Sequence, residues 1–243
     1  MQVEPFLRYL ELVPEKVADW NVHPFTVPAV AGLGRLDFNP GVTFLVGENG
    51  SGKSTLIEAI AIRAGFNREG GTKNFRSAHR PSESSLCDHV RLARGARREK
   101  TGFFLRAETM FNVSTEAEQY ASYGWADLHE MSHGEAFLWV AVNKFRENGL
   151  YILDEPEAAL SPQRQLALLV RIHQLVEAGS QFIVSTHSPI LLAYPKASIL
   201  LLDGSGIHPT RYEDTEHYAV TRAFLQDPAG RLRQLFAEGD DPP

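Results

Sequence analysis

The chain has 243 residues, of which 43% are hydrophobic and 22% charged, and its 24 Lys and Arg against 30 Asp and Glu give a formal charge of −6. This composition supports a packed core and excludes collagen-like, mucin-like and disordered classes. The apolar runs are far shorter than the ~18 residues of a membrane span. With Cys87 alone, no internal disulfide is possible, so we expect a reducing, cytoplasmic setting.

Residues 1–40 are rich in proline and contain short β-prone pieces such as Phe25-Thr26-Val27. Prolines between short strands are typical of turns and sheet edges. We therefore expect residues 1–40 to form a peripheral antiparallel β-subdomain.

A strand, a glycine loop and a helix are predicted next. Val42 to Val46 is β-prone, and Lys53 to Ile62 has helical composition and ends before Gly65. The loop between them satisfies G-x-x-x-x-G-K-[ST], in which backbone N–H groups surround phosphate oxygens, the lysine reaches the β- and γ-phosphates, and the hydroxyl binds Mg²⁺. An accidental glycine-rich turn is the alternative, and the flanking strand and helix argue against it. The candidate ATP-binding residues are Gly47, Glu48, Asn49, Gly50, Ser51, Gly52, Lys53, Ser54 and Thr55.

Residues 66–135 are expected to form an inserted subdomain. They contain a serine-rich stretch, a basic segment of helical composition and the strand-like run Gly102 to Leu105. Five cations within ten residues are more often a solvated helix face than a contact to DNA, and both readings stay open. These cations are Arg91, Arg94, Arg97, Arg98 and Lys100.

An alternation of helices and strands follows residue 132. We predict a helix from about 134 to 147, a strand over 150–153, a helix that begins at Ser161-Pro162 and stops at Gly179, and strands over 182–184 and 198–202. Continuous apolar runs are typical of parallel strands buried on both faces. The predicted fold class is therefore α/β, with a mostly parallel core sheet flanked by helices.

Polar residues follow the predicted strands at the ends where a parallel sheet gathers its ligands. Asp154 and Glu155 come after strand 150–153, 101 residues beyond Lys53. We assign Asp154 to Mg²⁺ and Glu155 to general-base activation of water, since an acidic pair alone would be only a turn. His187 follows strand 182–184 and is expected to contact the γ-phosphate, although an isolated histidine is more often structural.

Ser132 begins a helix 22 residues before Asp154 and is followed by His133, Gly134 and Glu135. Ser132 is a natural N-cap, and its hydroxyl and the helix N–H groups could also bind a phosphate. Both roles are compatible.

Taken in order, the segments GENGSGKST, SHGE, LYILDEPEAALS and STHSP resemble the Walker A, signature, Walker B plus D-loop, and switch-histidine segments of the ABC-type P-loop ATPase superfamily, over residues 40–203. The resemblance implies a single ATPase domain with an antiparallel β-subdomain and a helical subdomain. It also implies ATP, Mg²⁺ and head-to-tail dimerisation, in which Ser132 and Gly134 act in trans.

Within the superfamily, the chain is similar to small stand-alone AAA/ABC ATPases related to SMC, RecF and OLD proteins. The matching stretches are Gly102–Glu108, Ser132–Glu135 and Asp154–Gln165. No glutamine is assigned to a Q-loop: Gln119 is left unassigned, and Lys73-Asn74-Phe75-Arg76 is the candidate stretch.

The expected function is an ATP-hydrolysing, ATP-dependent dimerising switch, with Lys53, Glu155 and His187 as catalytic residues and Ser54 and Asp154 as metal ligands. Its partner is an unidentified protein, or DNA held by the segment Arg91 to Lys100. The alternative is the ATP-binding subunit of a membrane transporter with a separate permease.

Overall fold

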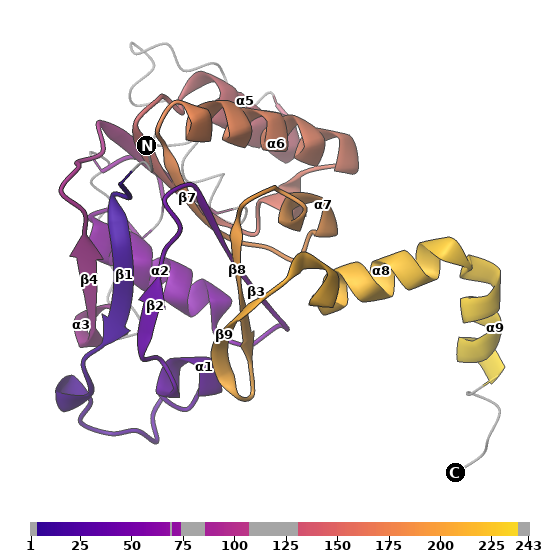
Figure 1. The fold of residues 1–243 in the computed structure, drawn as a ribbon, viewed down its shortest axis with the longest axis horizontal. Coiled ribbons are helices and arrows are strands. Elements are labelled where there is room, and N and C mark those ends of the chain that lie inside the picture. Colours follow the sequence, from indigo (N-terminus) through magenta and orange to yellow (C-terminus); the bar gives the residue numbers. More distant parts are fainter. Residues whose placement is uncertain (1–3, 69, 74–85, 107–130, 238–243) are drawn as a thin grey trace.

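The computed structural model describes residues 4–68, 70–73, 86–106 and 131–237. Figure 1 shows two sheets with a helix between them and further helices on the far side. The strands are β1 (Leu7–Leu12), β2 (Arg35–Asp37), β3 (Val42–Gly47), β4 (Val90–Arg94), β5 (Thr101–Arg106), β6 (Gly149–Asp154), β7 (Gln181–Ser185), β8 (Ser198–Asp203) and β9 (Gly206–Thr210). The helices are α1 (Pro28–Ala31), α2 (Lys53–Ala64), α3 (Leu86–His89), α5 (His133–Asn143), α6 (Pro162–Glu177), α7 (Pro189–Leu192), α8 (Glu216–Gln226) and α9 (Pro228–Ala237), with short 3-10 turns η1 (Pro14–Lys16), η4 (Pro156–Ala159) and η5 (Tyr212–Asp214).

The core sheet has the strand order β5-β6-β7-β3-β8-β9, and all neighbours are parallel except β8 and β9. Every residue of β3, β6 and β7 is buried, as expected for central strands covered on both faces. Because these three strands are adjacent and parallel, their carboxyl ends meet at one edge of the sheet.

The second sheet is antiparallel, with the order β2-β1-β4. The buried Gln181 side chain ties it to the core sheet, because its amide accepts from the Leu7 N–H and donates to the Leu7 carbonyl, both at 2.9 Å. The predicted strand at Phe25-Thr26-Val27 is wrong: these residues form a turn that leads into α1, where Val27 is the N-cap and Pro28 the first helical residue.

The region 66–135 contributes strands to both sheets. The basic segment predicted as a helix is instead strand β4 and the turn after it, since Val90 is buried in the antiparallel pairing with β1. Strand β5 pairs with β6 at the edge of the core sheet. Strand β4 thus belongs to the antiparallel sheet and strand β5 to the core sheet, although both lie within the expected insertion.

Two apolar clusters cover the two faces of the core sheet. One fills the space between the core sheet, α2 and the antiparallel sheet, and the other lies under α5, α6 and α7. Helix α2 is therefore held between two sheets, and this position fixes the loop that precedes it.

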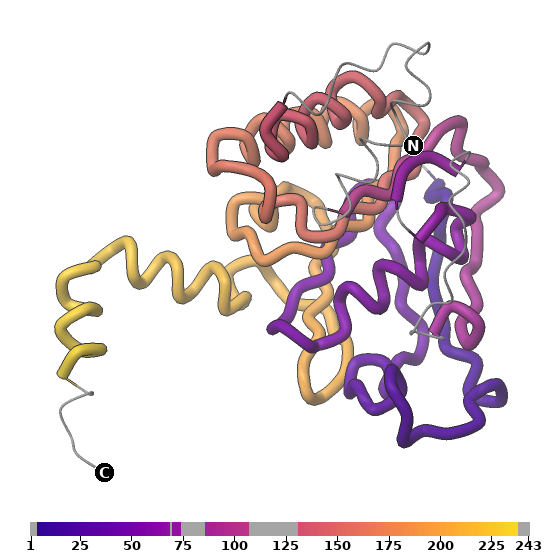
Figure 2. Tube along the Cα trace, turned by 180° about the vertical axis from the view of Figure 1, so that it is seen from behind, coloured from indigo at the N-terminus to yellow at the C-terminus, as the bar shows by residue number. Residues whose placement is uncertain are grey.

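The C-terminal helices α8 and α9 project from the body as an arm, seen from both sides in Figures 1 and 2. Neither helix contains a buried residue. Within the described ranges, none of the helices has both the length and the apolar character needed to cross a bilayer.

Candidate functional site

The glycine loop joins the buried strand β3 to the first turn of α2. Gly47, Gly50 and Gly52 have φ values of +152°, +81° and +101°, a region that side chains other than hydrogen disfavour. A Cβ on Gly47 would lie 2.3 Å from the Leu202 carbonyl oxygen of the adjacent strand β8. The Gly47 backbone can therefore pass β8 only without a side chain.

The loop has features of an anion-binding site. The hydroxyl oxygen of Ser51 is buried without a hydrogen-bond partner, which is uncommon for a buried polar atom. The first N–H groups of α2 have no partner within the helix, and the helix N-terminus carries partial positive charge. These donors and the free hydroxyl suit phosphate oxygens.

Lys53, at the start of α2, folds back over this loop. Its side-chain amine donates to the carbonyls of Gly47 and Glu48 at 2.8 and 2.9 Å, and the residue is only 4% exposed. Burial lowers the pKa of Lys53, and the carboxylates of Glu155 and Asp154 act in the opposite direction. The amine is thus already held at the position where the loop would receive phosphate.

Ser54 and Asp154 meet across the gap between α2 and β6. The Ser54 hydroxyl lies 3.4 Å from Asp154 Oδ1, and the Ser185 hydroxyl at the end of β7 donates to the same carboxylate oxygen. A hydroxyl and a carboxylate suit Mg²⁺, which takes few protein ligands and completes its shell with water and phosphate. Among the described residues, no group of three or more His, Cys, Asp or Glu side chains could hold a metal alone. The donor set therefore fits Mg²⁺ carried in with a nucleotide.

Glu155 and His187 lie next to this pair. Glu155 has a left-handed backbone with φ of +47°, and its N–H donates to the Ser185 carbonyl. Its Oε1 is 3.4 Å from His187 Nε2, and its side chain is 38% exposed. The carboxylate therefore faces both the histidine and the solvent from which a water would come.

Glu157 holds the His187 loop, a role that sequence reasoning missed although Glu157 lies within the segment LYILDEPEAALS. One carboxylate oxygen accepts from the His187 N–H, and the other accepts from the Thr186 hydroxyl at 2.7 Å. Burial raises the pKa of Glu157, while these two hydrogen bonds act to lower it. This side chain links the loop after β6 to the loop after β7.

Arg106, at the end of β5, is a second residue that sequence reasoning missed. It pairs in register with Asp154, and its Nε lies 3.3 Å from Asp154 Oδ2. Its Nη1 lies 3.4 Å from Glu58 Oε2 on α2. The alignment of a strand ending in Arg106 beside the strand ending in Asp154 was the available signal.

Ser132 and Gly134 lie at the start of α5. Ser132 is the N-cap and forms a capping box with Glu135, and Arg164 of α6 pairs with Glu135 at 2.9 Å. A Cβ on Gly134 would lie 2.3 Å from the Ala159 carbonyl oxygen. In the part of the chain that the structure describes, no hydrogen bond or ion pair joins Ser132 or Gly134 to Lys53 or its loop.

The basic segment is not an open face of five cations. Arg91 pairs with Glu11, and Arg94 pairs with Glu99 at 3.0 Å. Arg97 donates to Asn148 and lies over the Phe6 ring. Internal contacts thus hold three of the five cations, which weakens the argument for DNA at this segment.

Most of the Q-loop candidate stretch, residues 74–76, falls outside the described residues, as does the unassigned Gln119. Lys73 is described and pairs with Glu99 in the turn after β4.

Two protein-family models match the chain, and both describe AAA domains. A family model described as an AAA domain matches residues 21–115. A second AAA-domain model, whose description also names the AbiEii toxin of type IV TA systems, matches residues 107–193.

Curated relatives are distant. A Haemophilus influenzae protein described as an uncharacterized ABC transporter ATP-binding protein is 25% identical over 185 residues, 65% of this chain and 68% of that protein. A Campylobacter jejuni macrolide export ATP-binding/permease protein is 23% identical over 211 residues, 75% of this chain but only 32% of that protein. The chain spans about a third of that longer relative.

Solved structures agree on the fold. An inward-facing metal-chelate type ABC transporter matches with a TM-score of 0.51 at 16% identity, over 90% of this chain and 88% of that chain. A Clostridium perfringens protein that is part of an ABC transporter complex matches with a TM-score of 0.53 at 17% identity, over 96% of this chain and 100% of that chain. The predicted α/β fold, with a mostly parallel sheet and an antiparallel sheet, is confirmed.

Proposed function

We propose that this chain, with the motifs and fold of an ABC-type P-loop ATPase, binds ATP with Mg²⁺ and hydrolyses it to ADP and phosphate. The observation that carries the proposal is the meeting of three strand ends at one edge. The hydroxyl of the phosphate-loop residue Ser54 lies 3.4 Å from Asp154 Oδ1, and Glu155 Oε1 lies 3.4 Å from His187 Nε2. Phosphate binding, metal binding and water activation each have a side chain there.

In this proposal the glycine loop and Lys53 bind the β- and γ-phosphates. The Lys53 amine exchanges its bonds to the Gly47 and Glu48 carbonyls for phosphate oxygens, which form stronger, charge-assisted hydrogen bonds. The buried Ser51 hydroxyl gains a partner at the same time.

Ser54 and Asp154 would hold Mg²⁺, which when bound supplies charge neutralisation for the phosphates. The Ser185 hydroxyl keeps one Asp154 oxygen oriented. Without the metal, the Arg106 guanidinium balances the charge on Asp154 Oδ2.

Glu155 acts as the general base. Its partly exposed carboxylate can accept a proton from a water placed against the γ-phosphate. His187 donates from Nε2 to the γ-phosphate or to Glu155, and Glu157 fixes the backbone of the loop that carries it.

The signature residues serve a second copy of the chain. Ser132 and Gly134 lie at the N-terminus of α5, which among the described residues makes no hydrogen bond or ion pair to the glycine loop of its own chain. A helix N-terminus is suited to bind an anion. We place this N-terminus over the ATP of a partner in a head-to-tail dimer that closes with ATP and reopens after hydrolysis.

A second candidate follows from the relatives. Two curated relatives carry names of transport ATP-binding proteins, so the dimer could drive a separate permease chain. Affinity isolation of the Glu155→Gln protein with ATP, followed by identification of bound chains, tests this candidate: a permease supports it, and recovery of a non-membrane partner alone contradicts it.

The hydrolytic proposal is tested by phosphate release. Glu155→Gln should bind ATP as the unsubstituted protein does but hydrolyse it at least about 100-fold more slowly, in line with the loss of a general base. Glu147→Gln, an exposed carboxylate in the loop after α5, is the matched control and should hydrolyse ATP normally. Normal hydrolysis by Glu155→Gln would remove Glu155 from this role.

A further inference from the structure

The first turn of α8 places a second histidine against His187. His217 Nε2 lies 2.8 Å from His187 Nδ1, with ring centroids 4.9 Å apart and planes inclined by 57°. The other nitrogen of His187, Nε2, is buried without a hydrogen-bond partner and lies 3.4 Å from Glu155 Oε1. Three side chains therefore form a row from the C-terminal arm to the proposed base.

The chemistry of the row restricts where its protons lie. A neutral imidazole has one N–H and one acceptor nitrogen, and an ionised carboxylate only accepts. If His187 carried its proton on Nδ1, its bare Nε2 would face Glu155 with lone pair against carboxylate. If the proton is on Nε2, it points toward Glu155, and Nδ1 must accept from His217.

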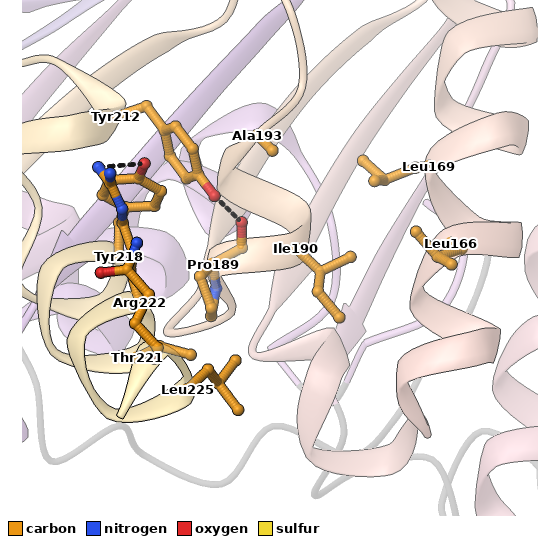
Figure 3. Close-up of a pocket in the computed structure, with 11 residues that line it drawn as sticks. Leu166, Leu169, Pro189, Ile190, Ala193, Tyr212, Tyr218, Thr221, Arg222 and Leu225 are labelled. Carbon is orange, nitrogen blue, oxygen red and sulfur yellow. Dashed lines mark hydrogen bonds between the residues drawn. The ribbon is translucent and has the colours of Figure 1, made fainter. Parts of the chain in front are cut away.

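His217 is held in place from the same loop that carries His187. The Tyr212 hydroxyl donates to the carbonyl of Pro189, two residues after His187, as Figure 3 shows. The Thr215 side chain caps α8 by accepting from the Tyr218 N–H, and the rings of Tyr212 and Tyr218 pack at 4.5 Å. The two imidazoles are thus oriented by contacts outside the pair.

The surroundings favour a neutral His217. Partial burial is the largest cause that lowers the pKa of His217 below its ordinary value; the proximity of His187 acts in the same direction, Glu216 opposes it, and Lys53 adds a smaller lowering effect. The residue also lies in the first turn of a helix, where positive charge is disfavoured. A neutral imidazole remains able to donate one proton.

We propose that His217 is a positioning residue for the ATPase reaction: its Nε2–H donates to His187 Nδ1 and holds His187 in the tautomer whose Nε2–H faces Glu155 and the γ-phosphate. This inference rests on the proposed function. It assigns to the base of the C-terminal arm a part in hydrolysis that the four sequence motifs do not contain.

The test compares two substitutions. His217→Phe keeps a planar ring but removes the donor, and His217→Gln keeps an N–H near the original Nε2. His217→Phe should lower kcat about 10-fold or more with the KM for ATP unchanged, as for groups that orient a functional histidine, and His217→Gln should recover most of kcat. His208→Phe, on strand β9, is the matched control. Equal kcat in the His217→Phe and unsubstituted proteins, or no recovery with Gln, would overturn the proposal.

A spectroscopic measurement reports on the tautomer without relying on hydrolysis. ¹⁵N NMR of the imidazole nitrogens, with His187→Gln to assign the signals, should show His187 protonated at Nε2 alone in the unsubstituted protein and a mixture of tautomers in His217→Phe. A proton on Nδ1, or on both nitrogens, would overturn the assignment. The expected spectra in a protein that hydrolyses no ATP would support the His187–His217 geometry while contradicting the proposed function.

Discussion

The carboxyl edge of the core sheet and the start of α5 are built differently. At the edge, side chains from α2, β6 and β7 contact one another, as in the convergence of Ser54 and Ser185 on Asp154. At the start of α5, Ser132 and Glu135 form a capping box, and among the described residues Arg164 of α6 is their other side-chain partner. In the proposed function, one chain supplies the phosphate, metal and water half of a site, and its signature half serves a partner chain.

The largest expected effect comes from the edge. Lys53→Ala should lower ATP affinity roughly 10- to 150-fold, because hydrogen bonds from a charged group contribute about 1.5–3 kcal/mol. Isothermal titration calorimetry measures the affinity, with Lys100→Ala, an exposed lysine before β5, as the control. Unchanged affinity in Lys53→Ala would mean that the loop is not the phosphate site.

The next effect separates the two regions. Ser132→Arg should abolish ATP-dependent dimerisation because a bulky cation would stand between the two copies, and it should spare ATP binding because Ser132 has no described contact with its own loop. Light scattering with and without Mg-ATP measures the dimer, and calorimetry the affinity. A loss of ATP binding by the monomer would place the signature in the same site as Lys53.

A smaller effect concerns the contact between the loops after β6 and β7. Glu157→Ala should destabilise the protein by about 1–3 kcal/mol because it leaves the part-buried His187 N–H and the Thr186 hydroxyl without their acceptor. Glu157→Gln, which keeps one acceptor oxygen, should cost less. Denaturant titration measures both, and equal losses would contradict this order.

The stability difference between the unsubstituted protein and Glu157→Gln should change with pH in one direction. Burial raises the pKa of Glu157 in the fold, so its stabilising contribution is complete below the unfolded pKa of about 4.3 and is lost as pH rises through the folded value. Relative to Glu157→Gln, the unsubstituted protein should therefore lose stability as pH increases above about 4.3 and then level off. A difference that grows in the other direction would contradict the raised pKa.

The smallest effect tests the scaffold beneath the signature. Ser161 caps α6 by accepting from the Arg164 N–H, and Ser161→Ala should cost about 1 kcal/mol of stability. ATP affinity should stay unchanged, because the cap lies on the α5–α6 side. A tenfold change in affinity would show that the two regions are coupled within one chain.

Much of the fold could be predicted because its signals are local. The strand ending at Asp154 is a continuous apolar run, and Ser161 with Pro162 begins α6 as expected. The helix predicted for the basic segment is wrong because its charge and composition favour a helix, whereas Val90 is buried by pairing with β1, some 80 residues away in the sequence. Tertiary pairing decides such a strand, and the sequence does not display it.

The candidate site divides in the same way. Residues inside the motifs, such as Lys53 and Asp154, could be named because the chemistry prescribes them and their spacing. Arg106, Glu157 and His217 could not, since each acts through a neighbour from another element. Sheet order and the return of α8 to the His187 loop bring these residues to the edge.

The central claim is that a complete site takes its two halves from two chains. Mixing Lys53→Ala with Ser132→Arg protein, each inactive alone, tests it by phosphate release, because a mixed dimer holds one site without either substitution. In the mixed dimer, the guanidinium introduced at position 132 of one chain faces the glycine loop of the Lys53→Ala chain, which has neither the lysine nor bound phosphate. A mixture of Lys53→Ala with Glu155→Gln, which damage the same half, is the control and should stay inactive. The account predicts recovery of up to about half of the unsubstituted activity, since each mixed dimer has one intact site of two. A mixture as inactive as its components would contradict it.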